Sequence, residues 1–369
     1  MGHSVRGPRK ILKYQDGFSL IELLVVMAIF VIVLAISADT FTIIMKQSSQ
    51  QAKASETQIE RIVGIELLRV DLESAGSGLP WSFQNSINYQ EAASAPAGNY
   101  NDSPSNVPRA IVTGNNTGTN GSDYLVIKST AVATSNTAQR YSYIANGSTI
   151  PKAWGNNDLS TGDRVIVITP QAGETNLRQL AMDSGSFFTQ YKTSGFAANF
   201  IPANPGEINL IYGVDPDTDL IMPFNRADYF ISTSSVPSYC APNTGVLEKV
   251  VVSQSDGSVT NYLPLLDCVA DFQVVFQTDT DGNGTIDNQA ATLDGLTAQQ
   301  VREQVKEIRV YILSHEGQKD TSFAYPNPII TIGDFGLGSA FNLSTKIGSG
   351  YRNYRWKVTT LIVQPKNLM

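Results

Sequence analysis

A long, mainly apolar run over residues 18–38 dominates the beginning of this sequence. An α-helix needs about 20 apolar residues to cross the hydrocarbon core of a bilayer, so the run is long enough. Its one ionisable side chain is that of Glu22, near the start of the run. A carboxylate inside a membrane is costly and commonly marks a functional position. The run therefore predicts a membrane-spanning helix that carries a functional acid.

The segment before this run is basic. It holds Arg6, Arg9, Lys10 and Lys13 against one acid, Asp16, and an excess of positive charge favours the cytoplasmic side. Two ordinary alternatives are a secretory signal peptide and a plain anchor. A signal peptide has a shorter apolar core followed by a small-x-small cleavage site. Ser37-Ala38 offers only a weak site of that kind, and neither alternative explains Glu22.

The stretch Gly17-Phe18-Ser19-Leu20-Ile21-Glu22 resembles the N-terminus of type IV pilins and of the pseudopilins of type II secretion. The resemblance implies that a prepilin peptidase cuts between Gly17 and Phe18 and methylates the new amino group of Phe18. It also implies that many such helices pack into a filament. Glu22 of one subunit would then neutralise the amine of Phe18 in a neighbour, so that neither charge lies alone in lipid.

The helix is expected to continue well beyond the membrane segment. Good helix formers follow residue 46, and the first glycine after Phe18 is Gly64. From Ile59 to Leu72 apolar residues recur at helical spacing, which is typical of a helix that lies on a core. Gly76 then provides a stop.

We predict an α+β, pilin-like fold. It consists of a leader over 1–17 and a long N-terminal helix over 18–76 that spans the membrane over 18–38. A large antiparallel β-rich domain over 77–369 follows, with an inserted subdomain within 81–265.

Beyond Gly76 the sequence alternates between short β-rich runs and polar turns. We expect a short helix over Leu296–Gln304, capped by Thr297, and irregular surface loops over Asn99–Ser122 and Gly173–Pro205. The expected strands are Asp123–Lys128, Arg164–Thr169, Ile208–Tyr212, Asp228–Ser232, Glu248–Ser253, Thr260–Leu265, Phe272–Gln277, Glu307–Leu313 and Arg355–Val363.

Four later segments, over 68–76, near Asp281, over 306–313 and over 354–363, resemble PilW-type pilus-assembly proteins. This resemblance implies a minor, low-copy pilin that helps to initiate assembly at or near the pilus tip. The implied partners are other minor pilins, the major pilin, prepilin peptidase, the inner-membrane assembly platform and a tip adhesin. The implied location is the bacterial inner membrane, single-pass, with the N-terminus cytoplasmic and the head periplasmic, and then the cell-surface pilus. A type II secretion pseudopilin of the J kind and a tip adhesin or receptor-binding module are the alternatives.

The segment Asp279–Asp287 has the spacing of a calcium loop. Asp279, Asp281, Asn283, Thr285 and Asp287 would supply oxygen ligands, and Gly284 would allow the tight turn. Position 12 of such a loop is Ala290, where a bidentate acid is usual. A polar hairpin turn without a metal is the alternative. A second acidic cluster, Asp215–Asp219, is best explained as a surface turn.

The two cysteines, Cys240 and Cys268, are expected to form a disulfide in an oxidising compartment. It would close a loop of about 28 residues and stabilise the fold by roughly 3 kcal/mol on the chain-entropy model. Two separate buried thiols are the alternative.

Composition excludes several functional classes. The net charge of −7 and the lack of a basic block outside the leader argue against nucleic-acid binding. The two histidines are His3 and His315, and we expect His315 in a turn. No nucleophile elbow, phosphate loop or zinc spacing occurs, so we expect no enzymatic activity and no cofactor other than calcium.

Overall fold

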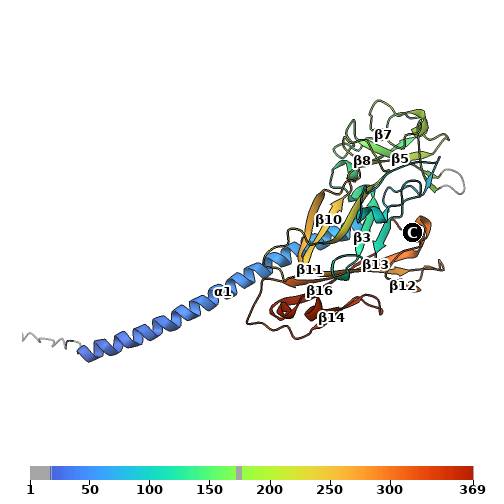
Figure 1. Cartoon of the computed structure of the whole chain (residues 1–369). Helices are drawn as coiled ribbons and strands as arrows, with labels where there is room; N and C mark the ends of the chain where they lie inside the picture. Colours follow the sequence, from blue (N-terminus) through green and yellow to red (C-terminus); the bar gives the residue numbers. More distant parts are fainter. Residues whose placement is uncertain (1–16, 18, 172–176, 369) are drawn as a thin grey trace, which may run out of the picture. The chain divides into compact units, whose positions relative to one another are not determined.

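The computed structural model describes Gly17, residues 19–171 and residues 177–368. By its internal contacts the chain forms two units, one up to Ala52 and one from Lys53 onward, which we call the head. Helix α1 (Leu20–Glu73) begins in the first unit and ends in the head (Figure 1). The predicted long helix is therefore confirmed, with Phe18 outside the described residues.

The end of α1 follows from Gly76, as the sequence predicts. Gly76 has a φ of +81°, a conformation that costs a side-chain-bearing residue free energy. Its N–H donates to the carbonyl of Lys128 at 3.0 Å, so the chain leaves the helix directly onto the sheet.

An eight-stranded antiparallel sheet forms the main layer of the head, in the order β16-β13-β11-β10-β9-β3-β2 with β12 on β11. Most of these strands are short, but β11 is an 18-residue strand that pairs first with β10 and then with β13. Their bounds are β2 (Ile111–Gly114), β3 (Tyr124–Ser129), β9 (Asn225–Ser232), β10 (Gly245–Val251), β11 (Asn261–Thr278), β12 (Asn288–Ala290), β13 (Val305–Glu316) and β16 (Arg355–Val363).

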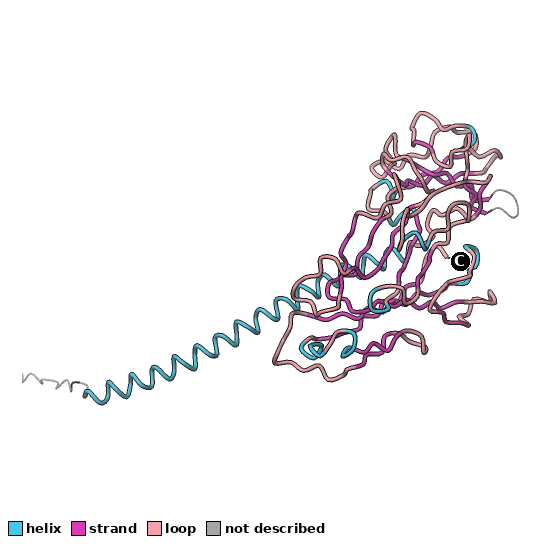
Figure 2. Tube along the Cα trace, viewed as in Figure 1, coloured by secondary structure: helices cyan, strands magenta, loops and turns pink. Residues whose placement is uncertain are grey.

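A six-stranded sheet with the order β1-β6-β5-β8-β4, and with β7 on β5, is built mainly from the chain between β3 and β9. Its bounds are β1 (Ser82–Phe83), β4 (Tyr141–Ala145), β5 (Arg164–Gln171), β6 (Leu177–Leu180), β7 (Thr189–Gln190) and β8 (Ile208–Asp215). Within the head, β5, β7 and β8 lie at the opposite end from β14 (Figure 1), and loops make up much of that end (Figure 2). The predicted inserted subdomain within 81–265 stays a prediction.

The remaining elements are small. Strands β14 (Ile329–Ile332) and β15 (Ser339–Asn342) form a hairpin. Helices α2 (Ala298–Gln304) and α3 (Leu343–Lys346) are short, and six 3-10 turns lie in the described loops: η1 (Ala97–Tyr100), η2 (Thr119–Gly121), η3 (Thr130–Val132), η4 (Thr137–Gln139), η5 (Ala198–Phe200) and η6 (Ser349–Asn353). Thr297 caps α2 in a complete capping box, as predicted.

The head is built around α1 and the eight-stranded sheet. Leu68 and Leu72 of α1 are fully buried in one cluster with Ile127 of β3 and Tyr229 of β9. Burial of apolar side chains of this size favours folding by about 1.5–3 kcal/mol each. The predicted class, a long N-terminal helix followed by a large antiparallel β-rich domain, is confirmed.

Two expectations about the head are wrong. The segment 99–122 is not a surface loop, because its Ile111–Gly114 pairs with β3 and is buried; an apolar run of this length is too short to stand out among polar neighbours. The strands expected at 260–265 and 272–277 are one strand, β11, since residues between them join the ladder through a bulge at Val269 and Asp271. Residues 177–200 are irregular, as expected, but they also carry β6, β7 and a buried Phe200.

Candidate functional site

Helix α1 begins in a reciprocal cap. The backbone N–H of Ser19 donates to Glu22 Oε2 at 3.0 Å, and the backbone N–H of Glu22 donates to Ser19 Oγ at 3.2 Å. Each side chain thus satisfies one of the N–H groups that a helix start leaves without a partner. Gly17 lies just outside the helix. The predicted cleavage position therefore precedes the first helical turn.

Ser19 was missed as a functional residue in the sequence. Its signal is the spacing Ser-x-x-Glu in front of an apolar run, which is the signature of a capping box. The same pattern gives Glu22 a role within its own chain in addition to the predicted role between subunits.

The first turns of α1 have no protein core around them. Leu20, Phe30 and Ile36 are each more than half exposed, and so are nearly all large apolar residues between them. Among the described residues, the segment Leu20–Lys53 is long and apolar enough to cross a membrane. Such a surface needs lipid or other apolar helices around it.

Within the head, the end of α1 is held by a glycine and by two charged residues. A Cβ atom on Gly64 would lie 2.0 Å from the carbonyl oxygen of Leu265, so the helix and β11 approach as closely as a glycine permits. Arg61 donates to Glu316 at 2.5 Å and to Ser314 at 3.2 Å. These contacts fix the helix to β11 and β13.

Asp71 of α1 is the second charged attachment. It is buried and accepts hydrogen bonds from Lys249 of β10 and from the hydroxyl of Tyr229 of β9. Burial raises the pKa of Asp71, although the Lys249 ammonium opposes this rise. A carboxylate on α1 thereby ties the helix to the centre of the eight-stranded sheet.

A buried ion network joins the same sheet to the connection before β2. Arg226 donates to Asp228 at 2.7 and 2.8 Å and to Glu91 at 3.0 Å. Lys128 contacts Glu91 and Asp102 at 2.7 Å each. The side chains of Arg226, Asp228 and Glu91 are fully buried, and that of Asp102 is almost fully buried. The network fastens the long connection 84–109 onto β3 and β9.

Cys240 and Cys268 are joined by a disulfide, with their Cα atoms 4.9 Å apart. His315 lies beside it: its Nε2 accepts the backbone N–H of Ala241 at 2.9 Å. The expectation that His315 is a turn residue is wrong, because it lies in β13 and is 1% exposed. Burial lowers the pKa of His315 to about 4, so the ring is neutral at pH 7 and can accept this bond.

Replacing both cysteines by alanine is expected to lower the free energy of unfolding by about 3 kcal/mol, because the open loop gains conformational entropy in the unfolded chain. Urea denaturation of the purified protein with and without a reductant measures this. Reduction should shift the wild-type midpoint to that of the double variant and leave the variant unchanged. Equal midpoints for the oxidised wild type and the variant would contradict the prediction.

The structure brings together three of the five predicted calcium ligands. One oxygen from each of Asp279, Asp281 and Asp287 lies within 4.8 Å of the others. Asp279 is buried and accepts N–H bonds from Gly282, Asn283 and Gly284, at 2.8, 3.1 and 2.8 Å.

Of the remaining predicted ligands, Asn283 already uses its side-chain oxygen within the turn. The side-chain oxygen of Asn283 accepts the N–H of Thr285 at 2.7 Å, so these two residues close the turn with each other. Ala290 lies in β12. Three carboxylates fit a hard cation, but calcium takes six to eight oxygens, so water and backbone carbonyls would have to supply the others. Calcium binding at this loop stays a prediction of the sequence.

In the presence of a chelator, Asp279→Ala is expected to lower the free energy of unfolding by about 1–3 kcal/mol. It leaves the N–H groups of Gly282 and Gly284 without an acceptor and that of Asn283 with Asp281 alone. Asp281→Ala, at an exposed position of the same turn, is the matched control and should have a smaller effect. Thermal unfolding measures both. A loss of stability from Asp281→Ala as large as that from Asp279→Ala would contradict the role of the Asp279 hydrogen bonds. A calcium-dependent rise in the melting temperature of the wild type that Asp281→Ala abolishes would identify the metal site.

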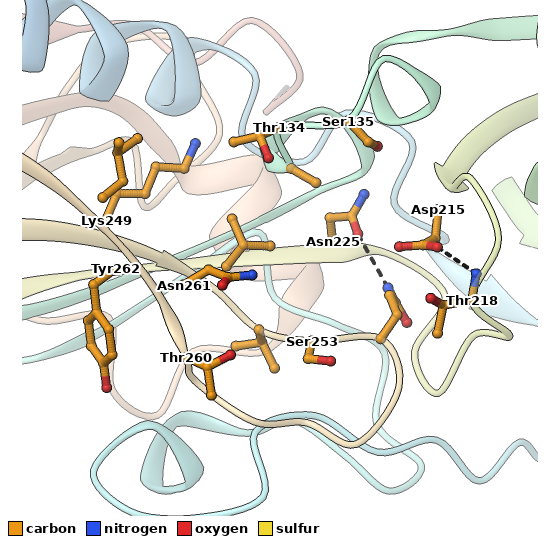
Figure 3. A pocket seen from close by; sticks show the side chains of 15 residues that line it. Thr134, Ser135, Asp215, Thr218, Asn225, Lys249, Ser253, Thr260, Asn261 and Tyr262 are labelled. Atoms are coloured by element: carbon orange, nitrogen blue, oxygen red, sulfur yellow. Dashed lines mark hydrogen bonds between the residues drawn. The ribbon is translucent and has the colours of Figure 1, made fainter.

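A polar groove of about 580 Å³ lies where β8, β9, β10 and β11 meet (Figure 3). Several of its polar groups are used by the fold. Asn225 donates to the carbonyls of Thr130 and Val214, at 2.9 and 3.0 Å, and Gln254 donates to the carbonyl of Phe224 at 2.6 Å. Asp215 caps the turn at Thr218, as expected for that acidic cluster. The groove is a seam between the two sheets.

Comparison with known families matches residues 12–38 to the prokaryotic N-terminal methylation motif. The N-terminus of the chain carries this methylation motif. The matched residues include the predicted leader end, Gly17, the predicted first mature residue, Phe18, and Glu22. Comparison with curated proteins gives no match. Among solved structures, a type IV-like pilin from Thermus thermophilus is similar at 11% identity and a TM-score of 0.29, over 84% of this chain and 97% of that one.

Proposed function

We propose that this chain is a minor, PilW-type pilin that prepilin peptidase processes and that takes part in initiating pilus assembly at or near the tip. The observation that carries the proposal is the methylation motif, whose exposed apolar helix holds one acid up to residue 38, Glu22. A large head attached to that helix supports a low-copy role, because a bulky subunit suits an end of a filament better than its repeating body.

The proposed sequence of events begins in the inner membrane. Prepilin peptidase cuts between Gly17 and Phe18, just ahead of the cap formed by Ser19 and Glu22. Removal of Gly17 leaves a positive amine on Phe18, which a neighbour's Glu22 neutralises. An unpaired charge in hydrocarbon costs several kcal/mol, so this pairing favours a helix in a filament over a helix alone in lipid.

Glu22→Ala is expected to insert normally in the membrane and to enter filaments at least about tenfold less often, since the Phe18 amine loses its partner. Quantitative immunoblots of sheared pili and of membranes measure the two pools. Ser19→Ala is the matched control, because it removes the hydroxyl half of the cap and keeps the acid. Normal incorporation of Glu22→Ala would contradict the pairing.

The proteins that bind this chain in the bacterial membrane distinguish a pilus-assembly role from a secretion role. Affinity purification from membranes should recover other minor pilins, the major pilin and the assembly platform. Recovery of secretion components in their place would assign the chain to the J-kind pseudopilins.

A further inference from the structure

A group of three aromatic rings lies at β4, the outer strand of the six-stranded sheet: two tyrosines on the strand and one tryptophan that follows it in the chain. Among the described residues, β4 pairs with β8 alone. The chain turns back after β4 at Gly147, which has a φ of +80°, and runs along the free side of the strand. There the N–H of Lys152 donates to the carbonyl of Tyr143 at 2.8 Å.

This return brings Trp154 to the tyrosines at alternate positions of β4. The ring centroids lie 6.1 Å apart for Tyr141 and Trp154, and 5.9 Å apart for Tyr143 and Trp154. Alternate residues of a strand share a face, so both tyrosines present their rings on the same side. We call Tyr141, Tyr143 and Trp154 the aromatic platform.

The loop that carries Trp154 is held in place by Asp158. The Asp158 carboxylate accepts the backbone N–H groups of Trp154 and Gly155. Arg140 in turn donates to the Asp158 carbonyl at 2.7 Å. The platform is therefore ordered before any ligand arrives, and a pre-ordered surface loses less conformational entropy on binding.

A cavity of about 490 Å³ opens beside the platform. Trp154 is 46% exposed and Tyr141 is 57% exposed, although large aromatic residues normally bury their rings. The rest of the lining is polar and consists of Asn136, Gln139, Arg140 and Asn157.

The polar rim is available to a ligand. Among the residues that the structure describes, the side-chain amides of Asn136, Gln139 and Asn157 and the indole N–H of Trp154 have no hydrogen-bond partner. In the groove of Figure 3, by contrast, the amides of Asn225 and Gln254 bond to the fold. Each free amide offers two donors and one acceptor oxygen.

These features fit a sugar ring. A pyranose has a face of C–H groups, which packs on an aromatic ring, and a rim of hydroxyls, which both donate to and accept from amides. A peptide that adds a strand needs an open sheet edge, and the segment at Lys152 occupies part of that edge. We propose that the aromatic platform and its amide rim bind the carbohydrate chain of a glycan, and that the head thereby has an adhesive function.

Calorimetric titration of the full-length protein, in a detergent without a sugar head group, tests this with cellohexaose, chitohexaose and maltohexaose. At least one is expected to bind with a Kd below about 1 mM. Trp154→Ala should weaken that binding by about tenfold or more, and so should Gln139→Ala combined with Asn157→Ala. Tyr262→Ala, at a 52% exposed tyrosine on β11, is the matched control and should leave it unchanged.

The proposal is overturned if none of the three sugars binds at about 10 mM, or if Trp154→Ala and Tyr262→Ala have equal effects. It is also overturned if the platform binds decaproline or a second copy of the chain in place of a sugar. Melting temperatures of the variants are measured alongside, and Tyr141→Ala provides a second probe of the platform. The result is independent of the assembly role, because the protein is tested outside a filament.

Discussion

Replacing Arg226 by methionine is expected to lower the free energy of unfolding by about 3–5 kcal/mol. The guanidinium holds Asp228 and Glu91 inside the head, and all three side chains are fully buried. Without the cation, Glu91 keeps Lys128 and two backbone N–H donors, and Asp228 keeps the hydroxyl of Tyr124, so each carboxylate retains only part of its compensation. Two incompletely paired charges in a low-dielectric interior destabilise the fold more than the lost contacts alone.

Urea denaturation of the wild type and the variant measures this loss. Arg69→Met is the matched control, because Arg69 pairs with Glu66 on the surface of α1 and such pairs contribute about 1 kcal/mol or less. Combining Arg226→Met with Asp228→Leu should restore part of the loss, since it removes one of the stranded charges. A loss from Arg226→Met no larger than that from Arg69→Met would show that the network is not needed for the stability of the head.

Gly64→Ala is expected to destabilise the head by about 2–3 kcal/mol, although alanine is the better helix former by about 1 kcal/mol. The added Cβ would lie 2.0 Å from the Leu265 carbonyl oxygen, so α1 and β11 would have to separate. The sign of the effect therefore distinguishes contact with β11 from helix propensity.

Thermal unfolding and limited proteolysis near the end of α1 test this second prediction. Ile62→Ala is the matched control on an exposed face of the same helix, where alanine should be neutral or slightly stabilising. An increase in melting temperature for Gly64→Ala would mean that β11 and the helix are not in close contact at this position.

The elements that the sequence predicted well depend on local signals. The apolar run, Gly76 as a stop and Thr297 as a cap are each read within a few residues, and the strand over Arg355–Val363 has the predicted bounds. Ser19 could also have been predicted, because its capping box with Glu22 is a local sequence pattern.

What the sequence did not predict depends on distant partners. Arg226 and Glu91 are 135 residues apart, and no local sequence pattern around either residue predicts that they pair. Gly64 appears in the sequence as a weak point of a helix, and its role becomes visible only when Leu265 lies against it. His315 has the neighbours of a turn residue, but β13 continues through it and carries it beside the disulfide.

The candidate site divides in the same way. Gly17, Phe18 and Glu22 form a contiguous motif, which the match over residues 12–38 contains. The aromatic platform combines strand residues with a tryptophan that a turn brings back, so its rings come together only in the folded head. Of the calcium ligands, the structure gathers the three aspartates, whereas Asn283 and Thr285 bond to each other.

The most direct test is mass spectrometry of the N-terminal peptide of the protein isolated from its native membrane. The mature chain is expected to begin at Phe18 and to carry one methyl group on its α-amine. A chain that begins at any other residue, or that retains the segment before Phe18, would contradict processing at Gly17 and with it the proposed entry of Glu22 into a filament.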